Sequence, residues 1–94
     1  MEIIKKVKKQ YFDAIVDNRK QFEIRLGDFD CHEGDVVILQ EQDDSTNELT
    51  GRTINCEVVY KINTKEAEKF YTKEEIEQHG LIILGIRRHY DFNN

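Results

Sequence analysis

The chain has 94 residues, of which 38% are apolar and 35% are charged, so we expect one domain spanning residues 1–94 with a modest core. No apolar run is long enough to span a membrane or to form a signal peptide, which indicates a cytoplasmic protein without a membrane partner. The net charge of −5 argues against strong non-specific binding to long nucleic acids. The two cysteines lie far apart and the three histidines are scattered, so we expect no disulfide, no metal site and no cofactor.

The charge is unevenly distributed along the chain. Residues 1–26 carry seven cations and four acids, a local charge of +3, whereas residues 27–57 carry one cation and nine acids, a local charge of −8. The remaining residues carry six of each sign. A basic surface on an acidic body can still bind a few phosphates or one nucleotide. The distribution therefore favours a small polar ligand over a long duplex.

The first quarter of the chain predicts a helix followed by a strand. Residues 1–9 either lead into the helix or form a brief strand before it. Residues 9–18 place their large apolar side chains on one helical face, and Asn18 tolerates the positive φ that often ends a helix. Residues 21–26 alternate between apolar and polar side chains, which predicts a strand with two different faces.

The middle of the chain predicts a β-hairpin. Residues 27–35 begin and end with turn-forming residues and should form a loop, and residues 36–41 form a β-branched strand. Residues 42–49 contain a cluster of Asp, Ser, Thr and Asn that reverses the chain, because these side chains satisfy nearby backbone groups. Residues 52–62 alternate and return as a long strand.

The last third predicts a short helix and an apolar strand. Thr72 and Glu75 have the spacing of a capping box, and the helix that they begin should stop by Gly80. Residues 81–86 are the most apolar segment and do not alternate, which predicts a central strand buried on both faces or the last strand of a barrel. The tail from Tyr90 should fray. The count is four or five strands and one or two short helices, an α+β and mainly antiparallel β chain that closes on itself.

Five motifs follow one another along nearly the whole chain: Tyr11-Phe12-Asp13-Ala14-Ile15, Lys20-x-Phe22-Glu23-Ile24-Arg25, Gly34-Asp35, Thr50-Gly51-Arg52 and Gly80-Leu81-Ile82-Ile83-Leu84-Gly85-Ile86. In this order they resemble the ASCH domains of the PUA-like superfamily, most closely a bacterial and phage group without an assigned function. The resemblance implies a small PUA-like β-barrel of about five strands with a helix beside it. It also implies a cleft near the helix-to-strand turn that binds RNA or a modified nucleoside.

Some members of that superfamily are small amide hydrolases that act on acylated cytidine, and the resemblance allows their motif to be compared with this chain. Their turn reads roughly Gly-x-Lys-Thr-x-Thr-x-Arg, with the Lys and the second Thr catalytic. Lys20 matches that Lys and Arg25 matches the Arg, but Glu23 stands where the second Thr would be. Lys6 matches a Lys that precedes the helix in the closer group. The missing hydroxyl nucleophile favours binding over hydrolysis.

The residues themselves also indicate a polar ligand. Arg25 offers a planar fork to phosphate or guanine, and Lys20 offers a point charge. Glu23 can accept from an exocyclic amine or act as a general base. A salt bridge between Glu23 and Arg25 is the competing interpretation. Arg52 is a candidate for the same cleft, with a solvated hairpin residue as its alternative.

Our leading hypothesis is an RNA- or nucleotide-binding module whose ligand contacts Lys20, Glu23, Arg25, Arg52 and Lys6. A hydrolase of modified nucleosides is the first alternative, with Lys20 stabilising charge and Glu23 activating water. A phage-type protein-interaction domain that uses the acidic residues 28–48 is the second.

Overall fold

A computed structural model describes residues 1–87 of the chain. In order, the elements are β1 (Glu2–Lys8), α1 (Lys9–Val16), β2 (Val36–Gln42), β3 (Leu49–Glu57), α2 (Thr64–Ala67), the 3-10 turn η1 (Glu68–Phe70) and α3 (Lys73–His79). The predictions about the tail from Tyr90 fall outside the described residues. Within residues 1–87, no helix is both long and apolar enough to cross a membrane.

The three strands form one open, mixed sheet in the order β1-β2-β3. β1 runs parallel to β2, with Lys5 opposite Leu39, and β3 runs antiparallel to β2, with Ile54 opposite Leu39. The pairing of β2 with β3 is interrupted between Gln40 and Gln42, where the register shifts. The predicted hairpin of residues 36–41 and 52–62 is therefore confirmed, with its second strand observed at Leu49–Glu57. Residues 1–9 form the brief strand that was one of their two predicted alternatives.

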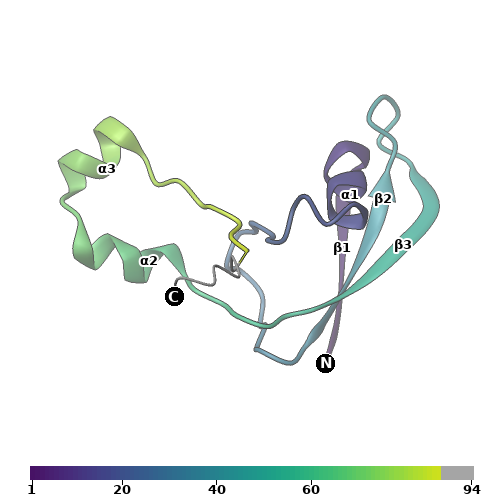
Figure 1. Cartoon of the computed structure of the whole chain (residues 1–94), viewed down its shortest axis with the longest axis horizontal. Helices are drawn as coiled ribbons and strands as arrows, with labels where there is room; N and C mark the ends of the chain where they lie inside the picture. The colour runs from purple at the N-terminus through teal and green to yellow at the C-terminus, as the bar shows by residue number, and fades with distance from the viewer. Residues whose placement is uncertain (88–94) are drawn as a thin grey trace, which may run out of the picture.

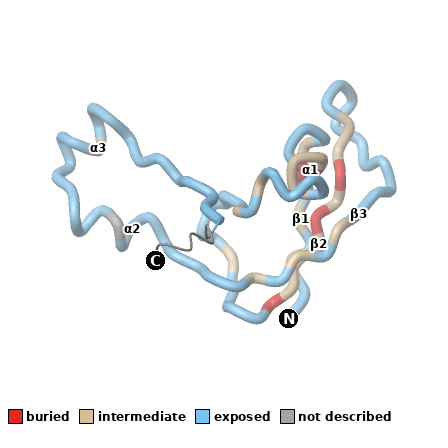
Figure 2. Tube along the Cα trace, viewed as in Figure 1, coloured by how far each residue is buried: buried red, intermediate tan, exposed pale blue. Residues whose placement is uncertain are grey.

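The core lies between α1 and one face of the sheet (Figures 1 and 2). Val7 from β1, Phe12 from α1 and Leu39 from β2 are buried. The partly buried side chains around them are Ile15, Val37, Ile54 and Cys56. Alternation along each strand explains this set, because residues two apart point to the same face of a sheet. Burial also raises the pKa of the Cys56 thiol, with the nearby Glu23 carboxylate contributing.

Three local predictions about turns and caps are confirmed. Asn18 has φ 63° just after α1, and Gly80 has φ 69° just after α3. Thr72 Oγ1 accepts from the Glu75 N–H at 3.1 Å, and Glu75 Oε1 accepts from the Thr72 N–H at 2.8 Å, which completes the capping box. These motifs depend only on residues within one turn of each other, so the sequence contains all the information that they need.

The turn between β2 and β3 is built on Asp43. Its Oδ1 accepts from the Ser45 hydroxyl at 2.7 Å, the Ser45 N–H at 2.9 Å and the Thr46 N–H at 3.1 Å. These bonds stabilise the ionised carboxylate, and with the Ser45 hydroxyl as the largest cause they lower the pKa of Asp43 to about 2. The predicted cluster of turn residues thus closes the hairpin through one carboxylate.

The predicted five-stranded barrel is wrong. Within residues 1–87 there are three strands, and the sheet is open at both β1 and β3. Residues 21–26 and 81–86 belong to no helix or strand, and β3 ends at Glu57, so residues 58–62 lie outside it. Alternation predicts an extended backbone, but a strand also needs a neighbour that satisfies its N–H and C=O groups. Residues 58–80 lead the chain away from the sheet before residues 81–87 return (Figure 1).

Candidate functional site

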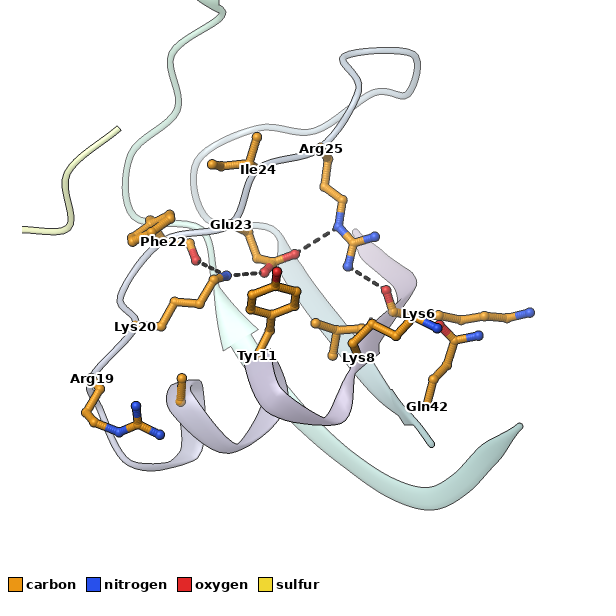
Figure 3. Close-up of a pocket in the computed structure, with 12 residues that line it drawn as sticks. Lys6, Lys8, Tyr11, Arg19, Lys20, Phe22, Glu23, Ile24, Arg25 and Gln42 are labelled. Carbon is orange, nitrogen blue, oxygen red and sulfur yellow. Dashed lines mark hydrogen bonds and ion pairs between the residues drawn. The ribbon is translucent and has the colours of Figure 1, made fainter. Parts of the chain in front are cut away.

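The end of α1 places a cationic segment beside β1. After Val16 the chain turns back through Asn18, and the N–H groups of Arg19 and Lys20 both donate to the Ala14 carbonyl, at 2.9 and 3.0 Å. A non-glycine residue with positive φ is unusual, and Asn is among the residues that tolerate it best. The reversal is tight enough to direct residues 20–25 past the exposed flank of α1 (Figure 3).

A hollow of about 670 Å³ lies between this segment, α1 and β1. We call it the cationic hollow. Figure 3 shows its lining, which comprises Lys6, Val7, Lys8, Tyr11, Ala14, Arg19, Lys20, Phe22, Glu23, Ile24, Arg25 and Gln42. Its volume falls within the range of small-molecule sites, about 300–1,000 Å³.

Glu23 lies between the two predicted cations and contacts both. Its Oε1 accepts from Lys20 Nζ at 2.6 Å, and its Oε2 accepts from Arg25 Nε at 2.8 Å. Lys20 Nζ also donates to the Phe22 carbonyl at 2.7 Å and lies 4.9 Å from the centre of the Phe22 ring. The competing interpretation of a salt bridge between Glu23 and Arg25 is therefore confirmed, with a hollow beside the pair.

Arg25 also joins the segment to the sheet. Its Nη2 donates to the Lys6 carbonyl at 2.6 Å, which binds the guanidinium to the edge of β1 that β2 does not cover. One side chain thus contacts both Glu23 and β1.

The lining of the hollow is strongly cationic on a protein that is acidic overall. The lining contains five cations, Lys6, Lys8, Arg19, Lys20 and Arg25, and one carboxylate, that of Glu23, which gives a formal charge of +4. Within residues 1–87, the Lys6 ammonium has no hydrogen-bonding or ion-pair partner. Like charges gathered in one concave region focus the electrostatic potential there. The hollow can therefore attract an anion even though the whole chain carries −5.

Two of these cations are held in place by other surface groups. Lys8 Nζ donates to the side chain of Asn47 in the hairpin turn. Arg19 pairs with Asp17, its Nη2 lying 2.9 Å from Asp17 Oδ2. Both contacts are exposed, so they are screened by water and cost little to break. Lys8 and Arg19 can therefore turn toward a ligand.

Residues 4–86 match a protein family described as a domain of unknown function, DUF3850. The chain belongs to the DUF3850 family. A search of the curated proteins and a search of the solved structures gave no match. The comparisons thus establish the family of the chain and leave its activity to be argued from the site.

The DUF3850 fold brings four of the five predicted site residues together. Lys6, Lys20, Glu23 and Arg25 all line the cationic hollow, whereas Arg52 does not. Arg52 lies on the other flank of α1, where its Nη1 is 3.1 Å from Glu41 Oε2. Arg52 was a candidate for the same cleft, but its strand, β3, places it beside Glu41 of the neighbouring β2.

Sequence reasoning missed several residues that line the cationic hollow. Tyr11 belongs to the apolar face of the predicted helix, yet it is 47% exposed and lines the hollow, while its neighbour Phe12 is buried. Lys8 could have been found from its spacing, because Lys6 and Lys8 lie two apart on a strand and share a face. Arg19 and Gln42 carried no such signal, since their positions depend on the reversal after α1 and on the pairing of β1 with β2.

Proposed function

We propose that this DUF3850 domain binds a nucleotide or a short single-stranded segment of RNA, with a phosphate in the cationic hollow. The observation that carries the proposal is the formal charge of +4 on the lining of a hollow in a chain of net charge −5. A phosphate is the commonest biological anion that matches several cations at once, and Arg with Lys is a frequent pair for it. Lys6 is the first candidate contact, because its ammonium has no partner among residues 1–87.

Aromatic side chains support a nucleotide over a bare anion. Tyr11 and Phe22 both line the hollow, and Tyr11 is about half exposed. Sites for single-stranded nucleic acid combine a cationic surface with aromatic rings on which bases stack. The hollow thus offers both components of such a site, the cations for the backbone and the rings for a base. The resemblance of the sequence to RNA-binding ASCH domains supports the same proposal.

Glu23 acts in this proposal as a counter-ion that positions the two cations. Each of its carboxylate oxygens accepts from a different cation, so Lys20 and Arg25 are held within reach of one ligand. We place binding ahead of hydrolysis for two reasons. Glu23 is engaged on both oxygens, and no serine or threonine belongs to the lining of the described hollow.

The proposal is tested with the full chain and two probes. Fluorescence anisotropy measures binding of a labelled single-stranded RNA at about 50 mM salt, where phosphate contacts are strong. Calorimetry measures binding of AMP and CMP. We expect RNA binding whose logarithmic affinity falls with the logarithm of the salt concentration, with a slope of about −0.7 for each phosphate contacted.

Variants then locate the site. Lys6→Ala and Arg25→Ala should each weaken RNA binding and reduce the salt slope by about 0.7, because each removes one phosphate contact. Lys73→Ala is the matched control, since Lys73 is exposed on α3 and does not line the hollow. The proposal fails if the unaltered protein binds neither RNA nor nucleotides at low salt. It also fails if Lys73→Ala weakens binding as much as Lys6→Ala.

A further inference from the structure

Two segments of the chain outside the helices and strands lack backbone partners among the described residues. Residues 21–26 and 81–87 form no backbone–backbone hydrogen bond with any described residue. Both also carry exposed apolar side chains, including Ile24 and Leu26 in the first and Ile82, Leu84 and Ile86 in the second. Exposed, unpaired and apolar segments of this kind are templates for pairing with another chain. The sequences of both segments predict strands that the described chain does not form.

Residues 58–87 form an arm that extends away from the sheet (Figures 1 and 2). The arm returns to the rest of the chain near its end, where Arg87 Nη2 donates to the Asn18 carbonyl at 3.3 Å. A Cβ atom added at Gly85 would lie 2.8 Å from Cδ1 of Phe22, so the two segments meet at that residue. Along the rest of the arm, Val59, Tyr60, Ile62 and Phe70 are also exposed.

The surface of the chain is too large for a self-sufficient compact domain. It exposes 8084 Å², whereas a compact monomer of 11.2 kDa is expected to expose roughly 5,700 Å². Its radius of gyration is 15.9 Å, against about 12 Å for a compact domain of this length. The excess of roughly 2,400 Å² is well above the ~800 Å² that each partner buries in a standard interface. The surface therefore suffices for an extensive dimer interface.

We propose that the arm packs against a second copy of this chain in a two-fold symmetric dimer. Ile82, Leu84 and Ile86 of one copy would cover Ile24 and Leu26 of the other, and the reverse. Each chain has an exposed apolar segment, residues 81–87, and an exposed apolar surface at Ile24 and Leu26. If two copies exchange these segments, both apolar regions of each chain become buried. This self-complementarity is what a two-fold interface requires.

The charges on the arm also favour a second copy. Residues 58–87 carry five cations and five acids, so the arm is formally neutral although the whole chain carries −5. Two acidic chains repel each other, and the repulsion is smallest where neutral surfaces meet. A neutral apolar arm offers little attraction to nucleic acid, which is bound mainly through cations. The arm and the cationic hollow therefore have different partners.

The oligomeric state of the full chain tests the proposal. Light scattering coupled to size-exclusion chromatography should give twice the chain mass of 11.2 kDa. The double variant Ile82→Lys/Leu84→Lys should give the mass of one chain, because these side chains are 79% and 70% exposed and would lie in the interface. Asp44→Lys is the control: it adds the same charge of +2 in the exposed hairpin turn and should remain dimeric.

A second measurement needs no variant. The urea midpoint of a dimer that unfolds to free chains rises with protein concentration, whereas that of a monomer does not. We expect the midpoint of the unaltered chain to rise. A single-chain mass at all concentrations, a midpoint independent of concentration, or a double variant that still forms dimers would each overturn the proposal. Because none of these readouts involves RNA, the result does not depend on the proposed function.

Discussion

The buried carboxylate of Glu41 leads to an asymmetric prediction about stability. Its side chain is 3% exposed, and it is held by residues from β3 and α1. Oε1 accepts from the Thr50 hydroxyl at 2.6 Å, Oε2 is 3.1 Å from Arg52 Nη1, and Lys9 Nζ is 4.0 Å away. Arg52 is 52% exposed, and its guanidinium carbon lies 4.8 Å from the centre of the Phe12 ring. The pair thus joins one buried and one hydrated charge.

Replacing Arg52 and replacing Glu41 should destabilise the protein by different amounts, because Glu41 is buried and Arg52 is half exposed. Arg52→Ala leaves the Glu41 charge buried with one hydroxyl and a more distant ammonium. Breaking a fully buried pair costs about 3–5 kcal/mol, and partial exposure of Arg52 reduces this to roughly 2 kcal/mol. Glu41→Gln keeps the shape and an acceptor, and the remaining Arg52 can be hydrated, so we expect a loss of about 1 kcal/mol or less. The double variant should cost less than the sum of the two.

Urea unfolding at pH 7 measures these losses, with all variants compared at one protein concentration because the proposed dimer makes the midpoint depend on it. RNA binding provides the second readout. Arg52→Ala should leave the affinity of the folded protein unchanged, because Arg52 does not line the cationic hollow. Equal losses of stability for Arg52→Ala and Glu41→Gln would refute the reasoning. A large fall in RNA affinity with stability intact would place Arg52 in the binding site after all.

Glu23→Gln should strengthen the binding of inorganic phosphate about fivefold, because it removes one negative charge at about 4 Å, worth roughly 1 kcal/mol in water. Calorimetry would check this, and weaker binding would contradict the prediction, because it would show that holding Lys20 and Arg25 in place matters more than the removed charge. Asp43 has a folded pKa lowered to about 2, so its stabilisation is present above the unfolded pKa and is lost as pH falls through the folded value. Acid unfolding should therefore be steeper between about pH 4 and pH 2 for the unaltered chain than for Asp43→Asn, and identical curves would contradict the assignment.

Whether a prediction about the fold was confirmed depends on how far apart in the sequence the interacting residues lie. The helix ending near Asn18, the hairpin turned at Asp43 and the capping box of Thr72 with Glu75 were all predictable, since each depends on neighbours within a few residues. Residues 21–26 and 81–86 have the same quality of local pattern as β2, yet neither is a strand. The difference is the neighbour: β2 lies between β1 and β3, whereas these two segments pair with no strand among residues 1–87.

The sequence by itself determined the helix ends and turns of the chain, and it placed a Lys, a Glu and an Arg within six residues of each other. Such features are local, because backbone geometry and side-chain spacing alone decide them. The tertiary structure alone decided that Lys6, Lys8 and Arg19 join that group, that Arg52 pairs with Glu41 on the other flank of α1, and that the sheet stays open. Those outcomes depend on which segments meet in space, and that choice is made by packing and hydrogen bonding between residues far apart in the chain.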